Sequence, residues 1–448
     1  MNIESFVIVF YIALYAAAFA RFRYALFLYV FFLPIRSLIE TPILNILSFN
    51  VVFGFIFLFH AIKNGYIKKI KAPSSKTIRA LTSFLFVFFL VTVAIAIRER
   101  YILHEYLGQN FSVGWVINRF LIFIVTVLNF IVIIKFLLQV QYNRAIVYRA
   151  IISSALVIVL SVYFASWIDS IGINIREPLD ENIASYNDIM RFSGLYNGGD
   201  VNSLSTFLNL VIAFVLTNSV ISRKGLSYIS LAILVVLISG VIYTLSRMGF
   251  ITLLIIMTYY ILVLNTQVNK FSIRTVANLF IVAMVLFMAF FAVDYYGRLD
   301  TIIARLVEQG VTEEIGVGGH RFYRWSGFIE FTFENINRTL FGTNKIFYVM
   351  RTGIWTDPHN FFIKLFFLNG IIILGLFIRS AISLYRSFKR QHLTVIFLLF
   401  SIIILISMMI ISQVGFVSML ILYLGILVYD TNQNSNSYSA TKHPSKIR

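Results

Sequence analysis

The run LSYISLAILVVLISGVIYT at residues 226–244 decides the fold class, together with the run MGFITLLIIMTYYILVLN that follows almost at once at 248–265. Each run is apolar over the roughly 17–25 residues that a helix needs to cross the hydrocarbon core of a membrane. Comparable runs recur along the 448-residue chain, and short charged connections separate them. This pattern predicts a polytopic membrane protein built from helices.

The composition indicates the same class of protein. Of all residues, 59% are hydrophobic and only 12% are charged, whereas a soluble domain carries about a quarter charged residues. The chain has no cysteine, which excludes disulfides, thiolate metal sites and cysteine nucleophiles. The formal net charge is +18, but the basic residues lie between the apolar runs. We therefore expect them to record membrane topology and not to bind nucleic acid.

We predict an all-α, polytopic integral membrane bundle of about 12–14 transmembrane helices, with one large extracytoplasmic loop. The first apolar run lacks the basic leader and the cleavage site of a signal peptide, so it counts as a span. The expected spans are residues 5–20, 24–39, 43–62, 80–97, 115–138, 150–168, 201–221, 226–244, 248–265, 275–293, 361–378, 393–411 and 414–429.

These spans divide the chain into five parts. N-terminal transmembrane helices occupy residues 1–168, and transmembrane helices with arginine-bearing outer loops occupy 169–293. The large extracytoplasmic loop, expected to contain short amphipathic helices, covers 294–358, and C-terminal transmembrane helices cover 359–430. The tail at 431–448 is polar and basic, which predicts a disordered cytoplasmic segment.

The positions of lysine and arginine predict the orientation of the bundle. The connection 63–79 is rich in lysine and has no acidic residue, so it should face the cytoplasm. Counting spans from there places the acidic segment 169–200 and the long polar loop 294–358 on the other side of the membrane. We therefore expect that loop to face the periplasm or the cell exterior.

Two polar segments on the outer side carry an arginine beside glycine. In RFSGLYN at 191–197, Arg191 would lie at the membrane surface and Gly194 would let the backbone approach a ligand; a flexible loop with an interfacial anchor is the alternative. In SRMG at 246–249, Arg247 lies between two spans with almost no loop. An arginine at such a depth is usually paired or functional, and snorkelling to lipid headgroups is the alternative.

A third segment, GGHRFYRW at 318–325, opens an amphipathic helix that is expected to run to about residue 335 along the membrane surface. Arg321 and Arg324 are three positions apart and share one face of this helix. Their guanidinium groups would suit phosphate oxygens, which accept two hydrogen bonds from one arginine. A helix that serves only as an interfacial anchor is the alternative.

The fourth segment is His359-Asn360, at the mouth of the span 361–378. Pro358 makes the approach to the helix rigid, and a helix N-terminus favours anions. A neutral imidazole there could take a proton from a hydroxyl group near neutral pH. A lone histidine is more often structural, but the outer arginine segments favour His359 as a general base.

The sequence lacks the patterns of several other chemistries. It has no Walker-type phosphate loop, no dinucleotide fingerprint, no HExxH and no clustered metal-ligand pattern. We therefore expect no metal site and no nucleotide cofactor.

Taken in order, the four segments resemble motifs of the O-antigen ligase and polymerase superfamily of bacterial polysaccharide enzymes. The matching pieces are RFSGLYN at 191–197, SRMG at 246–249, HRFYRW at 320–325 with LFG at 340–342, and HNFFIKLFFLNGIIILG at 359–375. The resemblance covers residues of about 190–380. The chain departs from the family pattern at Gly198-Gly199-Asp200, where proline and asparagine are frequent, and at Gly342-Thr343-Asn344, where Gly-x-Gly is frequent.

The resemblance implies a metal-independent membrane glycosyltransferase. Its donor would be an undecaprenyl-pyrophosphate-linked oligosaccharide, used at the outer face of the bacterial cytoplasmic (inner) membrane. Membrane lipid and a chain-length regulator protein are the other expected partners. On this hypothesis the catalytic residues are His359 as base and Arg247 and Arg321 on the pyrophosphate. The substrate-binding residues are Arg191, Arg324, Asn360 and Gly194.

Three functions remain open at this point. A polymerase would add the growing chain to another lipid-linked repeat unit, and this is the function that we favour. A ligase would transfer lipid-linked polysaccharide to lipid A core or another surface acceptor, and no residue in the sequence separates the two. A lipid-linked oligosaccharide flippase needs polar residues within its spans, and the predicted spans are nearly free of them.

Overall fold

The computed structural model describes ten segments of the chain and a few residues between 83 and 133. The segments are residues 3–35, 49–65, 141–164, 194–196, 201–221, 226–244, 246–261, 325–343, 345–352 and 360–390. Within them every regular element is a helix and there is no strand; one isolated antiparallel bridge joins Ile35 to Tyr196. The predicted all-helical class is confirmed for these residues.

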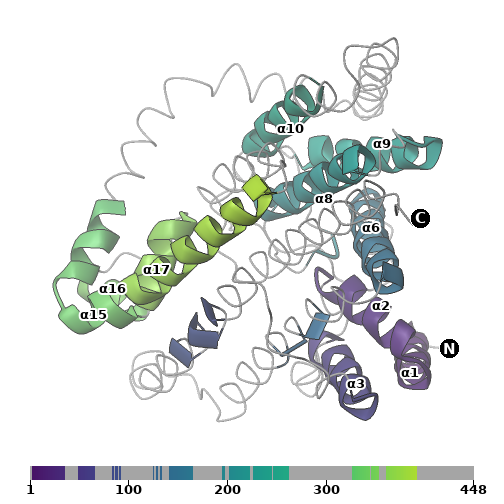
Figure 1. Ribbon diagram of the computed structural model, residues 1–448, viewed down its shortest axis with the longest axis horizontal. Helices are drawn as coiled ribbons and strands as arrows, with labels where there is room; N and C mark the ends of the chain where they lie inside the picture. The colour runs from purple at the N-terminus through teal and green to yellow at the C-terminus, as the bar shows by residue number, and fades with distance from the viewer. Residues whose placement is uncertain are drawn as a thin grey trace, which may run out of the picture.

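Figure 1 shows how the described helices are arranged. In chain order they are α1 (Ile3–Ala20), α2 (Phe22–Phe32), α3 (Phe49–Lys63), α6 (Gln141–Tyr163), α8 (Val201–Ile221), α9 (Tyr228–Tyr243), α10 (Arg247–Tyr259), α15 (Ile336–Phe341), α16 (Lys345–Thr352) and α17 (Phe361–Arg390). Residues 325–333 form a further helical segment before α15. Helices α15, α16 and α17 lie together at the left of the view.

Two stretches of the described chain are long and apolar enough to cross a membrane, by length and composition: Ala145–Tyr163 and Phe362–Ser383. Shorter apolar helices occupy Ile8–Ala20, Phe22–Phe32, Val52–Lys63, Tyr228–Tyr243 and Gly249–Tyr259. All of these coincide with expected spans. The expected spans 80–97, 115–138, 275–293, 393–411 and 414–429 lie wholly or mostly outside the described residues, as does the tail 431–448.

Several helix ends differ from the sequence-based expectation. The span expected at 24–39 is a helix only as far as Phe32, two positions before Pro34. Leu33 still has helical dihedral angles, but Pro34 has no amide hydrogen to donate to the preceding turn, so the helix ends here. Helix α2 alone is therefore too short to cross a bilayer. Conversely, α6 begins at Gln141 and already contains the exposed Arg149, and α17 continues to Arg390. Basic residues such as Arg149 and Arg390, which were expected in the connections, thus lie within the ends of helices.

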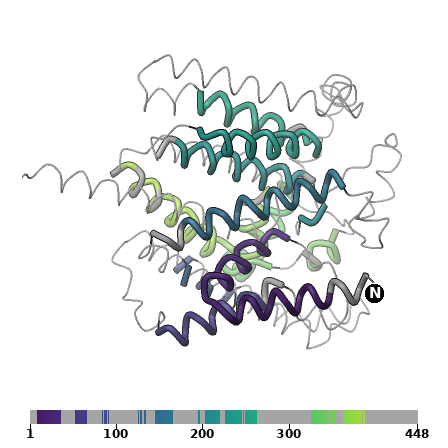
Figure 2. Tube along the Cα trace, turned by 90° about the vertical axis from the view of Figure 1, so that its right-hand side faces the viewer, coloured from purple at the N-terminus to yellow at the C-terminus, as the bar shows by residue number. Residues whose placement is uncertain are grey.

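Helix α8 lies at the centre of the described core. It packs against α6, α9 and α10, and its side chains from Ser203 to Leu216 are buried. On the N-terminal side, α2 packs against α1, α3 and α6, with Tyr29 stacked on Phe57 at 5.8 Å between ring centroids. Seen from the side in Figure 2, α1, α6 and the helices α8 to α10 run roughly along one common direction.

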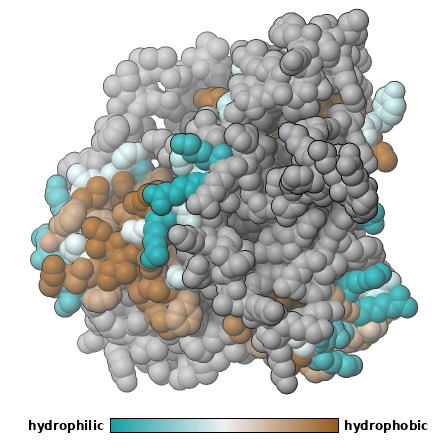
Figure 3. Space-filling model, viewed as in Figure 1, coloured by the Kyte–Doolittle hydropathy of each residue, from teal (hydrophilic) through white to brown (hydrophobic). Residues whose placement is uncertain are grey.

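Large hydrophobic side chains remain exposed on the described surface. Ile12 on α1 is 61% exposed, and Ile62 on α3 is 60% exposed. A continuous hydrophobic area also covers α15, α16 and α17 in Figure 3, to which Phe333, Ile336 and Met350 contribute. Apolar surface of this kind is rare on soluble monomers and is typical of surfaces that meet a membrane or a partner.

Candidate functional site

The described residues include only part of the predicted site. Arg191, Arg321, Arg324 and His359 lie outside them. Gly194, Asn360 and the backbone of Arg247 lie within them. The surroundings of the four motif segments can therefore be described, and the contacts of the four undescribed side chains stay predictions.

Gly194 is needed for packing against α6. Its φ is +56°, and a Cβ atom there would lie 2.5 Å from Ser161 Oγ and 3.0 Å from the Val162 amide nitrogen. The next amide, that of Leu195, donates to Ser161 Oγ at 2.9 Å. The close backbone approach predicted for this glycine is present, but it is made to a neighbouring helix. Contact of Gly194 with a substrate stays a prediction.

The rest of the RFSGLYN segment is also anchored to the core. Tyr196 is buried and stacks on Phe207 of α8, with 5.5 Å between ring centroids. Tyr196 also forms the bridge to Ile35 beyond the end of α2. Residues 194–196, the described part of the segment, are thus held between α6, α8 and the end of α2.

The SRMG segment begins α10 and is tied to α8. Ser246 is the N-cap of α10, where its Oγ accepts from the amide of Gly249 at 3.1 Å. The same hydroxyl donates to Asn202 Oδ1 at 2.9 Å. Arg247 is therefore the first residue of α10. A cation is disfavoured at the positive end of a helix dipole, so an anion beside this turn would relieve the repulsion.

Asn360 is the N-cap of α17. Its Oδ1 accepts from the amides of Phe362 at 3.0 Å and Ile363 at 3.2 Å, which satisfies donors that the first turn of a helix leaves unpaired. The carboxamide oxygen is thus engaged within the protein. The Nδ2 group is the part of this side chain that could bind a substrate, and that contact stays a prediction. Sequence reasoning missed the cap, although asparagine before an apolar helix is a common capping signal.

Helix α17 is broken at Gly370, where φ is +75° and ψ is 178°. The rings of Phe362 and Phe377 lie only 6.1 Å apart, whereas a straight helix would separate these positions by about 22 Å. The two halves of α17 therefore turn back toward each other. The stretch expected as one span at 361–378 has the required composition, but the fold-back at Gly370 divides it.

The fold-back is held by two close backbone contacts, one at Gly370 and one at Gly342. A Cβ atom on Gly370 would lie 2.2 Å from the Leu340 carbonyl oxygen, and one on Gly342 would lie 2.2 Å from the Leu368 carbonyl carbon. The amide of Thr343 donates to the carbonyl of Phe367 at 2.8 Å, which caps the first half of α17. The LFG piece at 340–342 and the piece at 359–375, which are separate pieces of the motif pattern, are therefore in direct contact.

The predicted amphipathic helix packs on protein and not only along a membrane surface. Its described part ends near residue 333, and Asn335 caps the new helix α15. Phe328 and Phe331 share one face, and both are buried against Tyr348 of α16 and Phe367 of α17. The ring centroids of Phe328 and Tyr348 are 4.1 Å apart. This apolar face therefore fixes residues 325–333 to α17.

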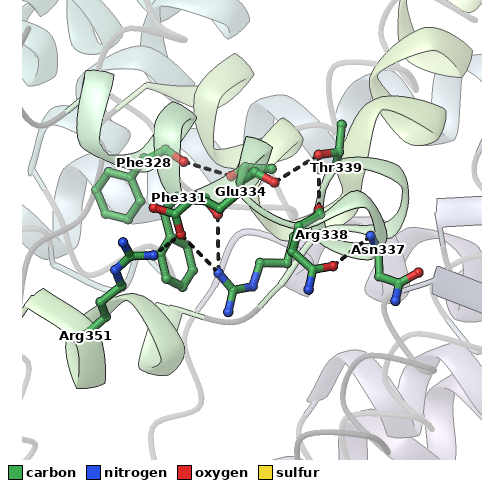
Figure 4. Close-up of polar contacts among 9 residues, drawn as sticks. Phe328, Phe331, Glu334, Asn337, Arg338, Thr339 and Arg351 are labelled. Carbon is green, nitrogen blue, oxygen red and sulfur yellow. Dashed lines mark hydrogen bonds and ion pairs between the residues drawn. The ribbon is translucent and has the colours of Figure 1, made fainter.

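An ionic cluster beside this face was not singled out from the sequence. Figure 4 shows Glu334 between Arg338 and Arg351, and Glu334 forms ion pairs with both. The guanidinium of Arg338 lies 4.0 Å from the Phe331 ring centroid, and that of Arg351 lies 5.8 Å from it. Two arginines on one carboxylate leave a net positive charge. The only signal in the sequence was the i, i+4 spacing of Glu334 and Arg338.

No cluster of three or more His, Asp or Glu side chains suited to a metal ion occurs among the residues that the structure describes. The sequence matches no protein-family model, and no curated protein matches it at a significant level. The motif geometry therefore has to carry the functional argument.

Proposed function

We propose that this protein is a membrane glycosyltransferase that polymerises undecaprenyl-pyrophosphate-linked oligosaccharide units at the outer face of a bacterial cytoplasmic membrane. The observation that carries the proposal is the packing of the motif segments. The LFG piece docks into the fold-back of the α17 piece through Gly342 and Gly370. The glycine and serine of SRMG are each engaged with α8. Residues that look like scattered motifs in the sequence are thus built into tertiary contacts.

The chemistry follows from the charges of the motif residues. When the anomeric bond to the pyrophosphate breaks, negative charge grows on the leaving group, and a fixed arginine stabilises that charge. Arg247, at the start of α10, and Arg321 take this role. His359 accepts the proton of the attacking sugar hydroxyl, and Arg191, Arg324 and Asn360 Nδ2 hold the donor and acceptor glycans. The reaction uses no metal or nucleotide.

The membrane setting of the proposal rests on composition and exposure. The apolar stretch Ala145–Tyr163, which is long enough to cross a membrane, exposed isoleucine and phenylalanine side chains and a net charge of +18 suit a multi-pass protein among anionic lipids. Membrane lipid and a chain-length regulator protein are the proposed partners besides the glycan donor.

One observation favours a flippase as the second candidate. Contrary to the expectation of nearly apolar spans, α8 carries a partly buried Asn202 and the buried polar residues Ser205 and Asn209. Polar groups inside a bundle can line a transport path. Most of these groups, however, hydrogen-bond to α8 itself or to α10, and the stripe contains no charge. This arrangement suits helix packing better than glycan passage.

The test is a deletion of the gene in its own host, complemented with the parent protein or with His359→Ala, and read on a gel of surface polysaccharide. A polymerase predicts that the deletion and His359→Ala both leave a single repeat unit attached and abolish the ladder, while the variant stays at parental amount in the membrane. Accumulation of lipid-linked polymer without surface attachment would indicate a ligase. A ladder of unchanged length distribution in the deletion strain would exclude both enzymes.

A further inference from the structure

The N-terminal turn of α10 is joined to one polar stripe on α8, formed by Asn202, Ser205 and Asn209. These residues recur at i, i+3 and i+7, so they lie on the same face of α8. Asn202 Oδ1 accepts from Ser246 Oγ at 2.9 Å, and Asn209 Nδ2 donates to the carbonyl of Gly249 at 2.8 Å. Both ends of the tetrapeptide SRMG are thus tied to α8.

The approach between the two helices is close at Gly249. A Cβ atom there would lie 2.5 Å from Ser205 Cβ and 2.6 Å from Ser205 Oγ, so only glycine allows this spacing. The same glycine donates its amide to the capping hydroxyl of Ser246. The first turn of α10 is therefore fixed by its cap, by two hydrogen bonds across the interface and by direct contact with the backbone of a glycine.

Helix association alone does not require these polar groups. Apolar and small side chains hold membrane helices together through packing, and burying an amide without a complete set of hydrogen bonds is costly. Asn209 is fully buried, and among the residues that the structure describes its Oδ1 has no hydrogen-bond partner. A leucine, which has the same branched shape, would avoid that cost. Directional hydrogen bonds add what apolar packing lacks: they fix both the rotation of α10 and its position along α8.

We propose that Asn202 and Asn209 are positioning residues for Arg247. Arg247 lies between Ser246 and Gly249, the two residues that the stripe holds, so the stripe sets where the arginine leaves the helix. This inference rests on the proposed function, in which Arg247 binds the pyrophosphate of the donor. The ligand class is a lipid diphosphate, because a guanidinium fixed at a helix N-terminus suits a doubly charged group.

The test measures binding of undecaprenyl pyrophosphate, with undecaprenyl monophosphate as the comparison, to the purified full-length protein in detergent micelles. We expect Arg247→Gln to weaken diphosphate binding about tenfold or more, the scale of one charge-assisted hydrogen bond. Asn202→Ala and Asn209→Leu should each weaken it by several-fold to tenfold and should reduce the preference for diphosphate over monophosphate.

A double-mutant cycle separates positioning from a general effect on the fold. If the stripe acts through Arg247, Asn202→Ala and Asn209→Leu will have no further effect in the Arg247→Gln background. Ser239→Ala is the matched control, because this buried hydroxyl bonds only the Val236 carbonyl of its own helix among the contacts described; it should leave binding unchanged.

Each remaining outcome has a definite meaning. Asn209→Leu removes a buried oxygen that has no partner among the described residues and keeps the branched shape of the side chain, so it should fold even if Asn202→Ala does not. Parental binding by this variant would overturn the proposal. Additive losses in the double variants would also overturn it. If Arg247→Gln binds the diphosphate as well as the parent does, Arg247 does not bind the pyrophosphate, and that part of the proposed function is excluded. If only Arg247→Gln weakens binding, the positioning role alone fails.

Discussion

At the scale of single residues, the structure separates side chains that build the site from those that would act in it. Ser246 and Asn360 were noticed in the sequence as neighbours of an arginine and a histidine. Both are helix caps in the structure. Their first task is to start α10 and α17 at fixed positions, next to the residues proposed to do the chemistry.

Asn360→Asp separates capping from substrate binding. Aspartate keeps the oxygen that accepts from Phe362 and Ile363 and suits the positive end of the helix. We therefore expect unchanged or slightly higher thermal stability, and loss of polymer formation if Nδ2 binds the glycan. Asn360→Ala should instead lower stability by about 1 kcal/mol, the usual cost of losing a cap. Melting curves in detergent and polymer gels give the two readouts; full activity in Asn360→Asp would remove Asn360 from the substrate-binding residues.

The ionic cluster on the outer loop should respond unequally to alanine substitution. Arg351 is 57% exposed at its side chain, so solvent screens its pair with Glu334, and Arg351→Ala should change stability by less than about 1 kcal/mol. Arg338 is less exposed and lies on the Phe331 ring, so Arg338→Ala should cost about 1 kcal/mol more through the lost cation–π contact. Equal melting temperatures for the two variants would show that the ring contact contributes nothing measurable.

At the scale of elements, α17 is the helix whose shape departs furthest from the expectation. The sequence predicts where its apolar residues lie, but not that the helix turns back on itself. The turn depends on two glycines, 28 positions apart in the sequence, each of which contacts the backbone of the residues just before the other. The spacing of apolar residues along a helix indicates which face is apolar, but it does not indicate which distant backbone segment a glycine will contact.

Substituting these glycines tests the fold-back. Gly370→Ala and Gly342→Ala place a Cβ at positive φ and about 2.2 Å from backbone atoms, so each should destabilise the protein by about 1–3 kcal/mol from backbone strain alone. Gly375→Ala is the matched control on the same helix, because no atom lies within 4 Å of its added Cβ. It should be neutral or stabilising by up to about 1 kcal/mol. Equal unfolding behaviour of all three variants in denaturant would contradict the fold-back.

At the scale of the whole molecule, the sequence predicts the helical class and the position of most described helices, because apolar runs determine both. It predicts less about the site. Asn209 and Gly249 lie 40 positions apart, and Asn202 and Ser246 lie 44 apart; one chain read alone does not indicate such pairs. Gly194 shows the limit well: its need for close approach was predicted, but the neighbour is α6.

The orientation can be tested by cysteine labelling, because the chain has no cysteine of its own. Asn64, at the end of α3, and Asn337, on α15, are both exposed. With the basic connection 63–79 inside and the loop 294–358 outside, a membrane-impermeant maleimide added to intact spheroplasts should label Asn337→Cys and not Asn64→Cys. Permeabilised cells, in which both should react, are the control. Labelling of Asn64→Cys alone would show that the topology is the opposite of the predicted one.

The fold-back of α17 has a consequence for side reactions. Because Phe362 lies beside Phe377, the capped first turn of α17 packs beside the second half of the same helix, and His359 directly precedes that turn in the sequence. If His359 is the base of the proposed reaction, the helix surface beside this turn would limit the access of bulk water to it. An activated polyprenyl donor can react with water as well as with sugar. On the proposed function, a variant that straightens α17 should therefore release free oligosaccharide in place of polymer.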